Sequence, residues 1–461
     1  MLQIYNTLTQ KKETFTPIEA GKVRMYVCGV TTYDYCHLGH GRMLVVFDII
    51  VRFLRARGFD VTYVRNVTDI DDKIINRANE LGIPYDELAR KFTEIMHEDE
   101  KALNIQSPDI EPLATGHIDQ IIAMVKTLED KGFAYKADNG DVYFSVTRFP
   151  GYTKLSHRNL DELLSGARVD VEEAKQDARD FALWKSSKPA EPGWDSPWGR
   201  GRPGWHIECS AMSTHCLGDT FDIHGGGSDL IFPHHENEIA QSECATGKEF
   251  ARYWIHNGPL RIDNEKMSKS LNNFFTIRDV LTQYPSEVIR YFLASSHYRS
   301  AINYSSDNLG QASSALERLY NALKGIDSSS TPVAEDSVYE SRFMVAMEDD
   351  FNTPEAISVL FDLAREVNRL KQESPESAAP LAGLLVQLAG ILGFLQLPVE
   401  EFLKGGGENI NAEEIDSLIE QRNQARAEKN WALADEIRDK LKSLNVVLED
   451  KDGETSWRVE R

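Results

Sequence analysis

The sequence feature that most constrains the fold is the alternation of β-prone and helical segments in the first hundred residues. Val23–Val30 is short, apolar and β-prone, and so is Val61–Val67. Between them, apolar residues recur at helical spacing from Met43 to Leu54, and another helical run begins at Ile74. Strands that alternate with helices at this spacing form parallel sheets. The pattern therefore predicts an α/β domain with a parallel sheet at its centre.

The middle of the chain breaks this alternation and predicts an inserted antiparallel segment. Phe133–Val146 contains two β-prone stretches around an Asn-Gly turn, which is a strong hairpin signal. Glu191–His206 is rich in Pro, Gly and Trp, and we interpret it as a loop. The α/β pattern returns at Thr220, where a predicted strand leads into a loop of three glycines, Gly225–Gly227.

The last third of the sequence predicts helices followed by a small mixed module. Residues after about 310 have helical apolar spacing, interrupted by linkers at 327–332 and 405–407. The final 55 residues predict two helices and then a hairpin formed by Val446–Leu448 and Ser456–Val459.

Composition excludes several classes of protein. Five cysteines in 461 residues are too few for a disulfide scaffold and fit a reducing cytosol. We interpret Cys36, Cys216 and Cys244 as small buried hydrophobic residues. Because there is neither an uninterrupted apolar run of about 18 residues nor a basic leader before an apolar segment, we expect no membrane span, no secretory signal and a cytoplasmic protein. The net charge of −22 argues at first sight against a nucleic-acid partner.

Two short motifs carry residues suited to phosphate chemistry. His37-Leu38-Gly39-His40 follows a predicted strand and opens a predicted helix, whose N-terminus attracts anions. The alternative is a pair of ordinary histidines in a helix cap. In the second motif, Lys266 to Ser270 (Lys-Met-Ser-Lys-Ser), the lysines can neutralise charge that develops on phosphate oxygens. The alternative there is a solvated basic loop.

Together, the two motifs resemble the paired signatures of the class I aminoacyl-tRNA synthetases. The lysine motif matches at all five positions, and the histidine motif departs only by Leu38 in place of Ile. Three further strings, Tyr26–Thr31, Gly204–Met212 and His224–Glu238, resemble the cysteinyl-tRNA synthetases within that family. The resemblance covers essentially the whole chain.

The resemblance implies a division of the chain into five parts. An α/β Rossmann-like catalytic domain (1–110 and 190–255) contains an inserted connective domain with the antiparallel hairpin (111–189). A stem-contact region with the lysine motif (256–310), a helical bundle (311–403) and a small mixed α/β anticodon-binding domain (404–461) follow.

Four residues can supply ligands of the type that zinc binds: Cys28, Cys209, His234 and Glu238. His234 and Glu238 are four residues apart, which predicts one helix face, whereas the spacing of the two cysteines is too long to be diagnostic. Either cysteine could instead be a small buried hydrophobic residue. The resemblance implies that these four residues bind one Zn²⁺ per chain. In the family the zinc binds the substrate thiolate and so separates cysteine from serine, which pocket size cannot do.

The resemblance also assigns the nucleotide site and the reaction. It implies that His37, His40 and Lys269, assisted by Lys266, hold the phosphates of ATP, which enters with Mg²⁺. Gly39, Gly226 and Asp229 are implied ATP-binding residues, and Asp229 is the candidate for the ribose. The implied reaction activates L-cysteine with ATP and passes it to the 3′ end of tRNA(Cys), and the family suggests a monomer.

The resemblance also implies which residues bind the amino acid and which contact the anticodon. The implied cysteine pocket contains Gly29, Thr31, Thr68, Trp205 and His224. A core aromatic is the alternative for Trp205, and a helix cap is the alternative for Thr68. The implied anticodon contacts are Arg426, Trp431, Asp435 and Asp450. The acidic run from Asp69 to Asp72 lacks the rest of a calcium-loop pattern, so we interpret it as helix capping plus local charge.

Three other functions share parts of these features. A ligase that passes cysteinyl adenylate to an amino sugar would lack the C-terminal module. A noncatalytic tRNA-binding or zinc-storage protein would predict damaged motifs, and here they are intact. A zinc hydrolase needs an open position for water, and four protein ligands would leave none unless one of them yields. Residues 258–304 contain six Lys and Arg against four Asp and Glu, so we expect local rather than global attraction of tRNA.

Overall fold

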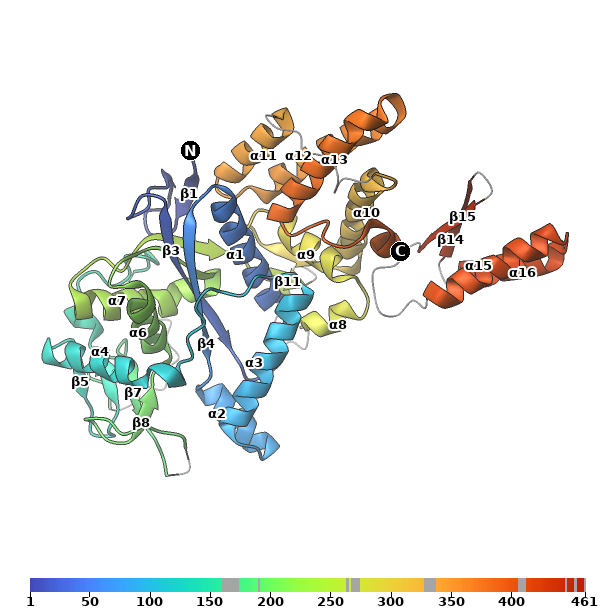
Figure 1. The fold of residues 1–461 in the computed structure, drawn as a ribbon. Helices are drawn as coiled ribbons and strands as arrows, with labels where there is room; N and C mark the ends of the chain where they lie inside the picture. The colour runs from blue at the N-terminus through green and yellow to red at the C-terminus, as the bar shows by residue number, and fades with distance from the viewer. Residues whose placement is uncertain are drawn as a thin grey trace.

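The computed structural model describes residues 1–159, 174–189, 191–262, 265–266, 274–326, 337–404, 412–443, 446–451 and 454–459. In Figure 1 the central strands and α1 lie in the middle of the molecule, and the inserted sheet lies on one side of them. The later helices and the C-terminal hairpin lie on the other side (Figure 1). Within the described ranges, no helix is long and apolar enough to cross a bilayer.

A four-stranded parallel sheet in the order β10-β9-β3-β4 forms the centre of the first half. Its strands are β3 (Lys22–Thr31), β4 (Asp60–Thr68), β9 (Phe221–Gly227) and β10 (Ala251–Asn257). The structure confirms the strands predicted at Val23, Val61 and Thr220. All four strands are largely buried because helices cover both faces of the sheet.

The predicted glycine loop is wrong, because Gly225–Gly227 are the last three residues of β9 and pair with Ile255–Asn257 of β10. A Cβ atom on Gly225 would lie 2.4 Å from the ring of Phe47, which belongs to the helix covering this face. The glycines therefore allow close packing against the sheet. Glycine is equally favoured in turns, so the local sequence does not show which of the two it serves here.

Helices connect the strands as the apolar spacing predicts. The helices of this part are α1 (Leu38–Ala56), α2 (Asp72–Leu81), α3 (Tyr85–Ala102), α6 (Trp205–Leu217) and α7 (Glu236–Thr246). α1 lies between β3 and β4 in the chain, and α7 lies between β9 and β10. The strand order reverses at β3, which has β4 on one side and β9 on the other. Ligands of open α/β sheets bind at such a switch point, beyond the carboxyl ends of the strands.

The inserted segment forms a second, antiparallel sheet. Its strands are β5 (Ala134–Lys136), β6 (Val142–Phe144), β7 (Phe181–Ser186) and β8 (Gly201–Pro203), and the helix α4 (Ile118–Asp130) packs against α6 and α7. The predicted hairpin is confirmed, with Ala134 paired to Phe144. The predicted loop Glu191–His206 is wrong at its end, because β8 pairs with β7 and α6 begins at Trp205. Pairing with a distant strand outweighs the turn-prone composition here.

The remaining elements complete the α/β part of the chain and form the helical region that follows it. The N-terminal hairpin consists of β1 (Gln3–Asn6) and β2 (Lys11–Thr14), and a three-stranded sheet consists of β11 (Leu260–Ile262), β12 (Glu265–Lys266) and β13 (Ile302–Tyr304). The short helices α8 (Ile277–Leu281) and α9 (Ser286–Ala294) precede a helical region. That region contains α10 (Ser306–Leu323), α11 (Val338–Glu348), α12 (Thr353–Glu373), α13 (Pro375–Ile391) and α14 (Val399–Leu403), as predicted after residue 310.

The C-terminal module has the predicted order of two helices and a hairpin. It contains α15 (Ala412–Ala427), α16 (Trp431–Ser443), β14 (Val446–Lys451) and β15 (Glu454–Val459). The two strands pair antiparallel and are longer than predicted. The predicted linkers at 327–332 and 405–407 lie outside the described residues.

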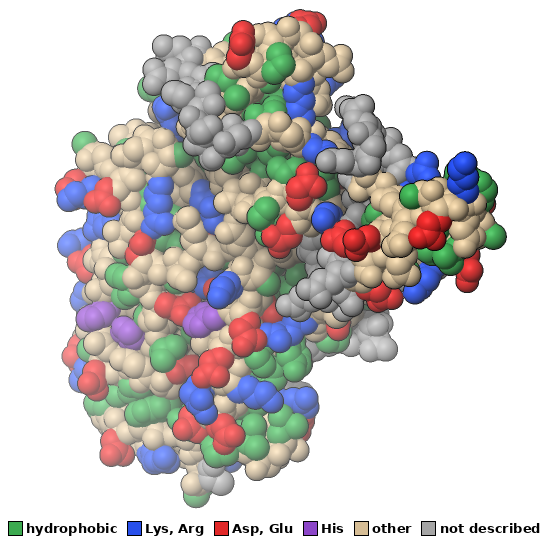
Figure 2. Space-filling view, turned by 45° about the vertical axis from the view of Figure 1, so that its right-hand side comes forward, with side chains coloured by type: hydrophobic (Ala, Val, Ile, Leu, Met, Phe, Trp, Pro, Cys, Tyr) green, Lys and Arg blue, Asp and Glu red, His purple; other side chains and the backbone are tan. Residues whose placement is uncertain are grey.

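Acidic and basic side chains are interleaved on the face shown in Figure 2, where red and blue groups alternate over most of the surface. The net charge of −22 therefore does not produce one continuous acidic region on this face. A nucleic acid that approached this face would meet local patches of either sign.

A buried ion pair fastens α1 to α9, which leads into the helical region. Asp48 of α1 accepts a hydrogen bond from Arg290 of α9 at 2.5 Å and another from Arg52 at 2.8 Å. Arg290 also donates to the carbonyls of Leu103 at 3.0 Å and Leu392 at 2.8 Å. The Arg290 side chain is fully buried, so every one of these contacts replaces water.

We predict that Asp48→Ala lowers the free energy of unfolding by roughly 3–5 kcal/mol, because it leaves the Arg290 charge buried without its carboxylate. Glu94→Ala, which removes the partner of Arg90 in a pair exposed by 63% and 70%, serves as the control. The control should cost at most about 0.5 kcal/mol. Urea unfolding followed by circular dichroism measures both values, and equal effects would contradict the structural role of Asp48.

Candidate active site and metal centre

The candidate site lies at the carboxyl edge of the central sheet, at the switch point between β3 and β9. β3 ends at Thr31, β4 ends at Thr68 and β9 ends at Gly227. A connection of six residues, 32–37, separates the end of β3 from α1, which begins at Leu38, so the N-terminus of the helix opens toward the same edge. Thr31, Thr68, Gly226 and the helix cap at His37 therefore lie at or next to one edge of this sheet.

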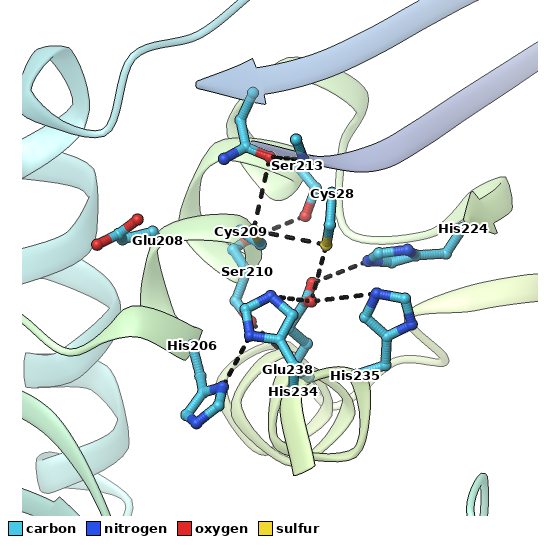
Figure 3. A network of polar contacts seen from close by, with 12 residues as sticks. Cys28, His206, Glu208, Cys209, Ser210, Ser213, His224, His234, His235 and Glu238 are labelled. Carbon is cyan, nitrogen blue, oxygen red and sulfur yellow. Dashed lines mark hydrogen bonds and ion pairs between the residues drawn. The ribbon is translucent and has the colours of Figure 1, made fainter. Parts of the chain in front are cut away.

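The four predicted metal ligands converge from separate segments of the chain (Figure 3). Cys28 lies in β3, Cys209 in α6, Glu238 in α7, and His234 in the helical turn η4 (Ile231–His235) immediately before α7. Their ligand atoms all lie within 4.8 Å of one another. His234 Nε2 and Glu238 Oε1 are 3.1 Å apart, so the two side chains face each other as predicted. The kink in this segment falls at Phe232, before His234, and His235 at the start of α7 has helical backbone angles.

The geometry of this cluster fits a tetrahedral metal ion. The Sγ atoms of Cys28 and Cys209 are 3.6 Å apart, whereas a disulfide requires about 2.0 Å. Two zinc–sulfur bonds of about 2.3 Å at a tetrahedral angle place the sulfurs about 3.8 Å apart. Cys28 Sγ and Glu238 Oε1 are 3.2 Å apart, and each of the four side chains is at most 3% exposed. Two thiols, an imidazole and a carboxylate form a donor set suited to zinc.

Burial and mutual charge shift the ionisation of all four groups. Burial raises the pKa of Cys28 well above its ordinary value, whereas the hydrogen bond from Cys28 lowers the pKa of Cys209. Burial opposes the charged form of His234, but the neighbouring Glu238 and Cys209 together outweigh it and raise the pKa of His234 to about 10. Burial likewise opposes the charged form of Glu238, but the surrounding histidines hold its pKa well below the ordinary value. In the absence of a metal ion, the cluster therefore retains protons at neutral pH that a metal ion would displace.

Further histidines surround the ligands and orient them. His224 Nε2 lies 2.8 Å from Glu238 Oε2, and its ring stacks on Trp254. His206 Nδ1 lies 2.8 Å from His234 Nδ1, and His235 Nδ1 lies 2.8 Å from His256 Nε2. Such contacts behind the ligands fix their orientation. Sequence reasoning identified His224 and missed His206, His235 and His256; the first two are adjacent to predicted residues, and nothing in the sequence marks His256.

The predicted amino-acid pocket borders the metal cluster. Trp205 is 39% exposed, and its ring centroid lies 4.3 Å from that of His234, so it is not a core aromatic. Thr68 is buried and donates to Glu208 at 3.1 Å, so it does not cap a helix. Thr31 pairs with Thr68 at the ends of β3 and β4.

Gly29 is fixed by a close backbone approach beside Cys28. Its N–H donates to Asn66 Oδ1 at 2.9 Å, and a Cβ atom there would lie 1.6 Å from the Asn66 carbonyl oxygen. Only glycine fits this position, where the register between β3 and β4 shifts. Asn66 Oδ1 also lies 3.6 Å from Cys209 Sγ, so this amide connects Gly29 to the metal cluster.

The two histidines of the His-x-Gly-His motif form the cap of α1. The backbone N–H of His40 donates to His37 Nδ1 at 3.2 Å, and the N–H of His37 donates to His40 Nδ1 at 3.3 Å. Their rings stack with centroids 3.6 Å apart. The cap that we considered as the alternative therefore exists, and it holds both rings beside the positive end of the helix, next to Gly39.

Residues that follow the lysine motif in the chain are hydrogen bonded beside this helix end. Leu38 donates to the carbonyl of Phe275 at 3.0 Å, and Ile277 donates to the carbonyl of Cys36 at 2.9 Å. Lys266 lies in β12. Lys269 and the rest of residues 267–273 lie outside the described residues.

The other predicted nucleotide residues lie at the end of β9. Gly226 is a strand residue, and a Cβ atom there would lie 2.9 Å from the ring of His235. Asp229 is exposed in the helical turn η3 (Ser228–Leu230) that directly follows the strand.

The predicted anticodon residues lie in the C-terminal module. Trp431 begins α16 and is 60% exposed, so it is not a helix-packing residue, and Asp435 in the same helix pairs with Arg438 at 3.1 Å. Arg426 is exposed in the last turn of α15, and Asp450 belongs to β14.

Of the other cysteines, Cys36 and Cys244 are buried as predicted, whereas Cys216 is only partly buried.

Family models match three successive regions of the chain. Residues 14–314 match the class I tRNA synthetase (C) catalytic domain, 342–396 match the DALR domain, and 412–458 match the cysteinyl-tRNA ligase anticodon binding domain. Among solved structures, the chain is similar to methionyl-tRNA synthetase of Mycobacterium tuberculosis in complex with methionyl-adenylate. That similarity has a TM-score of 0.57 at 16% identity and covers 90% of this chain and 96% of the other, so it shows a shared fold.

Curated relatives match along the full length. A cysteine–tRNA ligase of Pseudomonas putida is 61% identical over 460 residues, covering 100% of this chain and 100% of the relative. A cysteine–tRNA ligase of Pseudomonas aeruginosa has the same identity and the same coverage. The parallel sheet, the sulfur-containing cluster at its carboxyl edge and these matches agree: the chain belongs to the cysteine–tRNA ligase family of class I aminoacyl-tRNA synthetases.

Proposed function

We propose that the protein activates L-cysteine with ATP to form cysteinyl adenylate and pyrophosphate, and then transfers cysteine to the 3′ end of tRNA(Cys). The observation that carries the proposal is the buried cluster of two thiols, an imidazole and a carboxylate beside the capped N-terminus of α1. A thiol-selective group and an anion-binding helix end then lie at one sheet edge, where an amino acid and a nucleotide can meet.

The residues that would hold zinc are Cys28, Cys209, His234 and Glu238. Bound there, zinc would also bind the substrate thiolate, as a fifth ligand or in place of a protein ligand that yields, and the hydroxyl of serine would bind it poorly. Trp205, Thr68, Thr31 and Gly29 border this site and orient the amino acid, and His224 holds Glu238 through the 2.8 Å contact. The exclusion of serine then depends on chemistry rather than on size, because a hydrophobic pocket discriminates weakly between isosteres.

In the first step the cysteine carboxylate attacks the α-phosphorus of ATP, and pyrophosphate leaves. We infer that His37, His40 and Lys269, with Lys266 assisting, hold the phosphates as charge develops on their oxygens, and that Mg²⁺ accompanies ATP. The N–H groups at the start of α1, beside Gly39, suit the same task. We propose that Gly226 and Asp229 contact the nucleotide and that Asp229 accepts a hydrogen bond from its ribose, which the exposure of Asp229 directly after β9 supports.

In the second step a ribose hydroxyl of the terminal nucleotide, the 2′-hydroxyl in class I enzymes, attacks the acyl carbon, and AMP leaves. We propose that Arg426, Trp431, Asp435 and Asp450 contact the anticodon, which the exposure of Trp431 favours. The proposal includes a monomeric chain that acts in the cytoplasm and the division into five parts given above. These features follow from the family resemblance.

We predict that zinc removal abolishes the preference for cysteine. Cysteine-dependent ATP–pyrophosphate exchange should exceed serine-dependent exchange by at least about 100-fold, and chelation should remove most of the cysteine-dependent rate. Restoring Zn²⁺ should recover it. Equal rates with serine and cysteine in the zinc-loaded protein would disprove the assignment of the cluster.

We predict that Lys269→Ala slows cysteine-dependent ATP–pyrophosphate exchange by roughly 10²- to 10³-fold, because it removes a charge that stabilises the transition state. Zinc content, measured by atomic absorption, should be unchanged. Lys248→Ala, at a lysine exposed by 61% and paired with Asp219, is the control and should keep the full rate. A near-normal rate in Lys269→Ala would refute the role of the motif.

We predict that Zn²⁺ binding releases about two protons near pH 7. With the pKa of Cys28 raised above its ordinary value and that of His234 at about 10, both groups are protonated in the metal-free cluster at this pH. Apparent zinc affinity should therefore rise with pH and fall as the solution is acidified. Calorimetric titration in two buffers of different ionisation enthalpy gives the proton count, and a count of zero would contradict this description of the cluster.

A further inference from the structure

The acidic run that follows β4 has a role that capping alone does not explain. Asp71 accepts from the N–H of Lys73 at 2.8 Å and caps α2, as predicted. Asp69 accepts from the N–H and the hydroxyl of Thr115, at 2.9 and 2.5 Å. Asp72 pairs with Lys185 at 2.7 Å and with Arg202. Two of the three aspartates thus contact residues more than forty positions away.

Those distant residues lie at the two ends of the inserted segment. Thr115 lies just before α4, where the chain leaves the central sheet. Lys185 and Arg202 lie on the paired strands β7 and β8, where the chain returns to it. Asp69 and Asp72 therefore fasten both ends of the insertion to the carboxyl end of β4, four residues or fewer beyond Thr68.

The Asp72 contacts have a direct consequence for the pocket, because β8 leads straight into α6. After Pro203, Gly204 donates to the carbonyl of Leu183 at 2.9 Å, and a Cβ atom on Gly204 would lie 2.0 Å from the Ala182 carbonyl oxygen. The junction is thus held tightly against β7. The next residue is Trp205, whose half-exposed ring lies over His234.

We propose that Asp72 is a positioning residue for the amino-acid pocket. By bridging Lys185 and Arg202, its carboxylate sets the position of the β8–α6 junction and so holds Trp205 over the metal centre. Arg202 is only 10% exposed, so its contact with Asp72 is shielded from water on one side. This inference rests on the proposed function, because it assigns Trp205 to the cysteine pocket.

The test compares steady-state constants for cysteine-dependent ATP–pyrophosphate exchange in the zinc-loaded full-length protein. Asp72→Asn keeps the shape of the side chain and removes its charge, and it should raise the KM for cysteine about tenfold with kcat changed less than about twofold. Asp72→Glu should recover most of the loss. The control is Asp177→Asn, because Asp177 pairs with Arg179 within one loop of the same insertion, and it should keep the native KM.

A double-mutant cycle separates positioning from a general structural effect. If Asp72 acts through Trp205, adding Asp72→Asn to Trp205→Phe should change the KM by less than about twofold. Independent, multiplying effects would overturn the proposal, and so would an unchanged KM in Asp72→Asn. If Asp72→Asn does not fold, Lys185→Met is measured in its place, because it removes one of the two partners of Asp72. It should also raise the KM for cysteine.

The same experiment distinguishes two kinds of failure. If the native protein shows no cysteine-dependent exchange, the proposed function is wrong. If it shows exchange and Asp72→Asn has the native KM, only the positioning role is wrong.

Discussion

The contacts around Glu238 are the interaction on which the candidate site depends. Its carboxylate lies in the interior and meets Cys28, His234 and His224, which come from a strand, a helical turn and a second strand. A buried carboxylate is costly unless each oxygen is paired. The fold meets this demand by bringing β3 and β9 side by side at the switch point of the sheet. The metal ligands, the histidines behind them and the pocket residues are arranged around this one requirement.

The same sheet edge joins this cluster to the phosphate chemistry. A connection of six residues leads from β3 to α1, so His37, which caps this helix, lies nine residues after Cys28 in the chain. The residues that follow the lysine motif are hydrogen bonded to both sides of His37, at Cys36 and at Leu38. Buried contacts such as that of Asp48 with Arg290 hold α1 and α9 together, so the helix end that we propose as the ATP-binding end is fixed by the packing of the helices behind it.

Much of the local structure could be predicted because it depends on local patterns. The strands at Val23 and Val61, the helix between them and the Asn-Gly hairpin follow from apolar spacing and turn chemistry, and the structure confirms them. The errors occurred where distant pairing decides the outcome. Gly225–Gly227 form a strand because β10 and α1 pack against them, and Gly201–Pro203 form a strand because β7 pairs with them. Glycine and proline signal a turn in sequence, yet they also permit close backbone packing.

The sequence by itself determined the donor types and the two phosphate motifs, because these depend on residue identity at short spacing. The family resemblance, which rests on the sequence alone, identified Cys28, Cys209, His234 and Glu238 as one set of metal ligands. Only the tertiary structure decided that these four meet within 4.8 Å, since Cys28 and Cys209 are 181 positions apart. It alone revealed His256 behind His235 and Asp72 as a contact between the start of α2 and the insertion. Such partners carry no local signal, because a side chain that acts by holding a distant segment can follow any spacing in the chain.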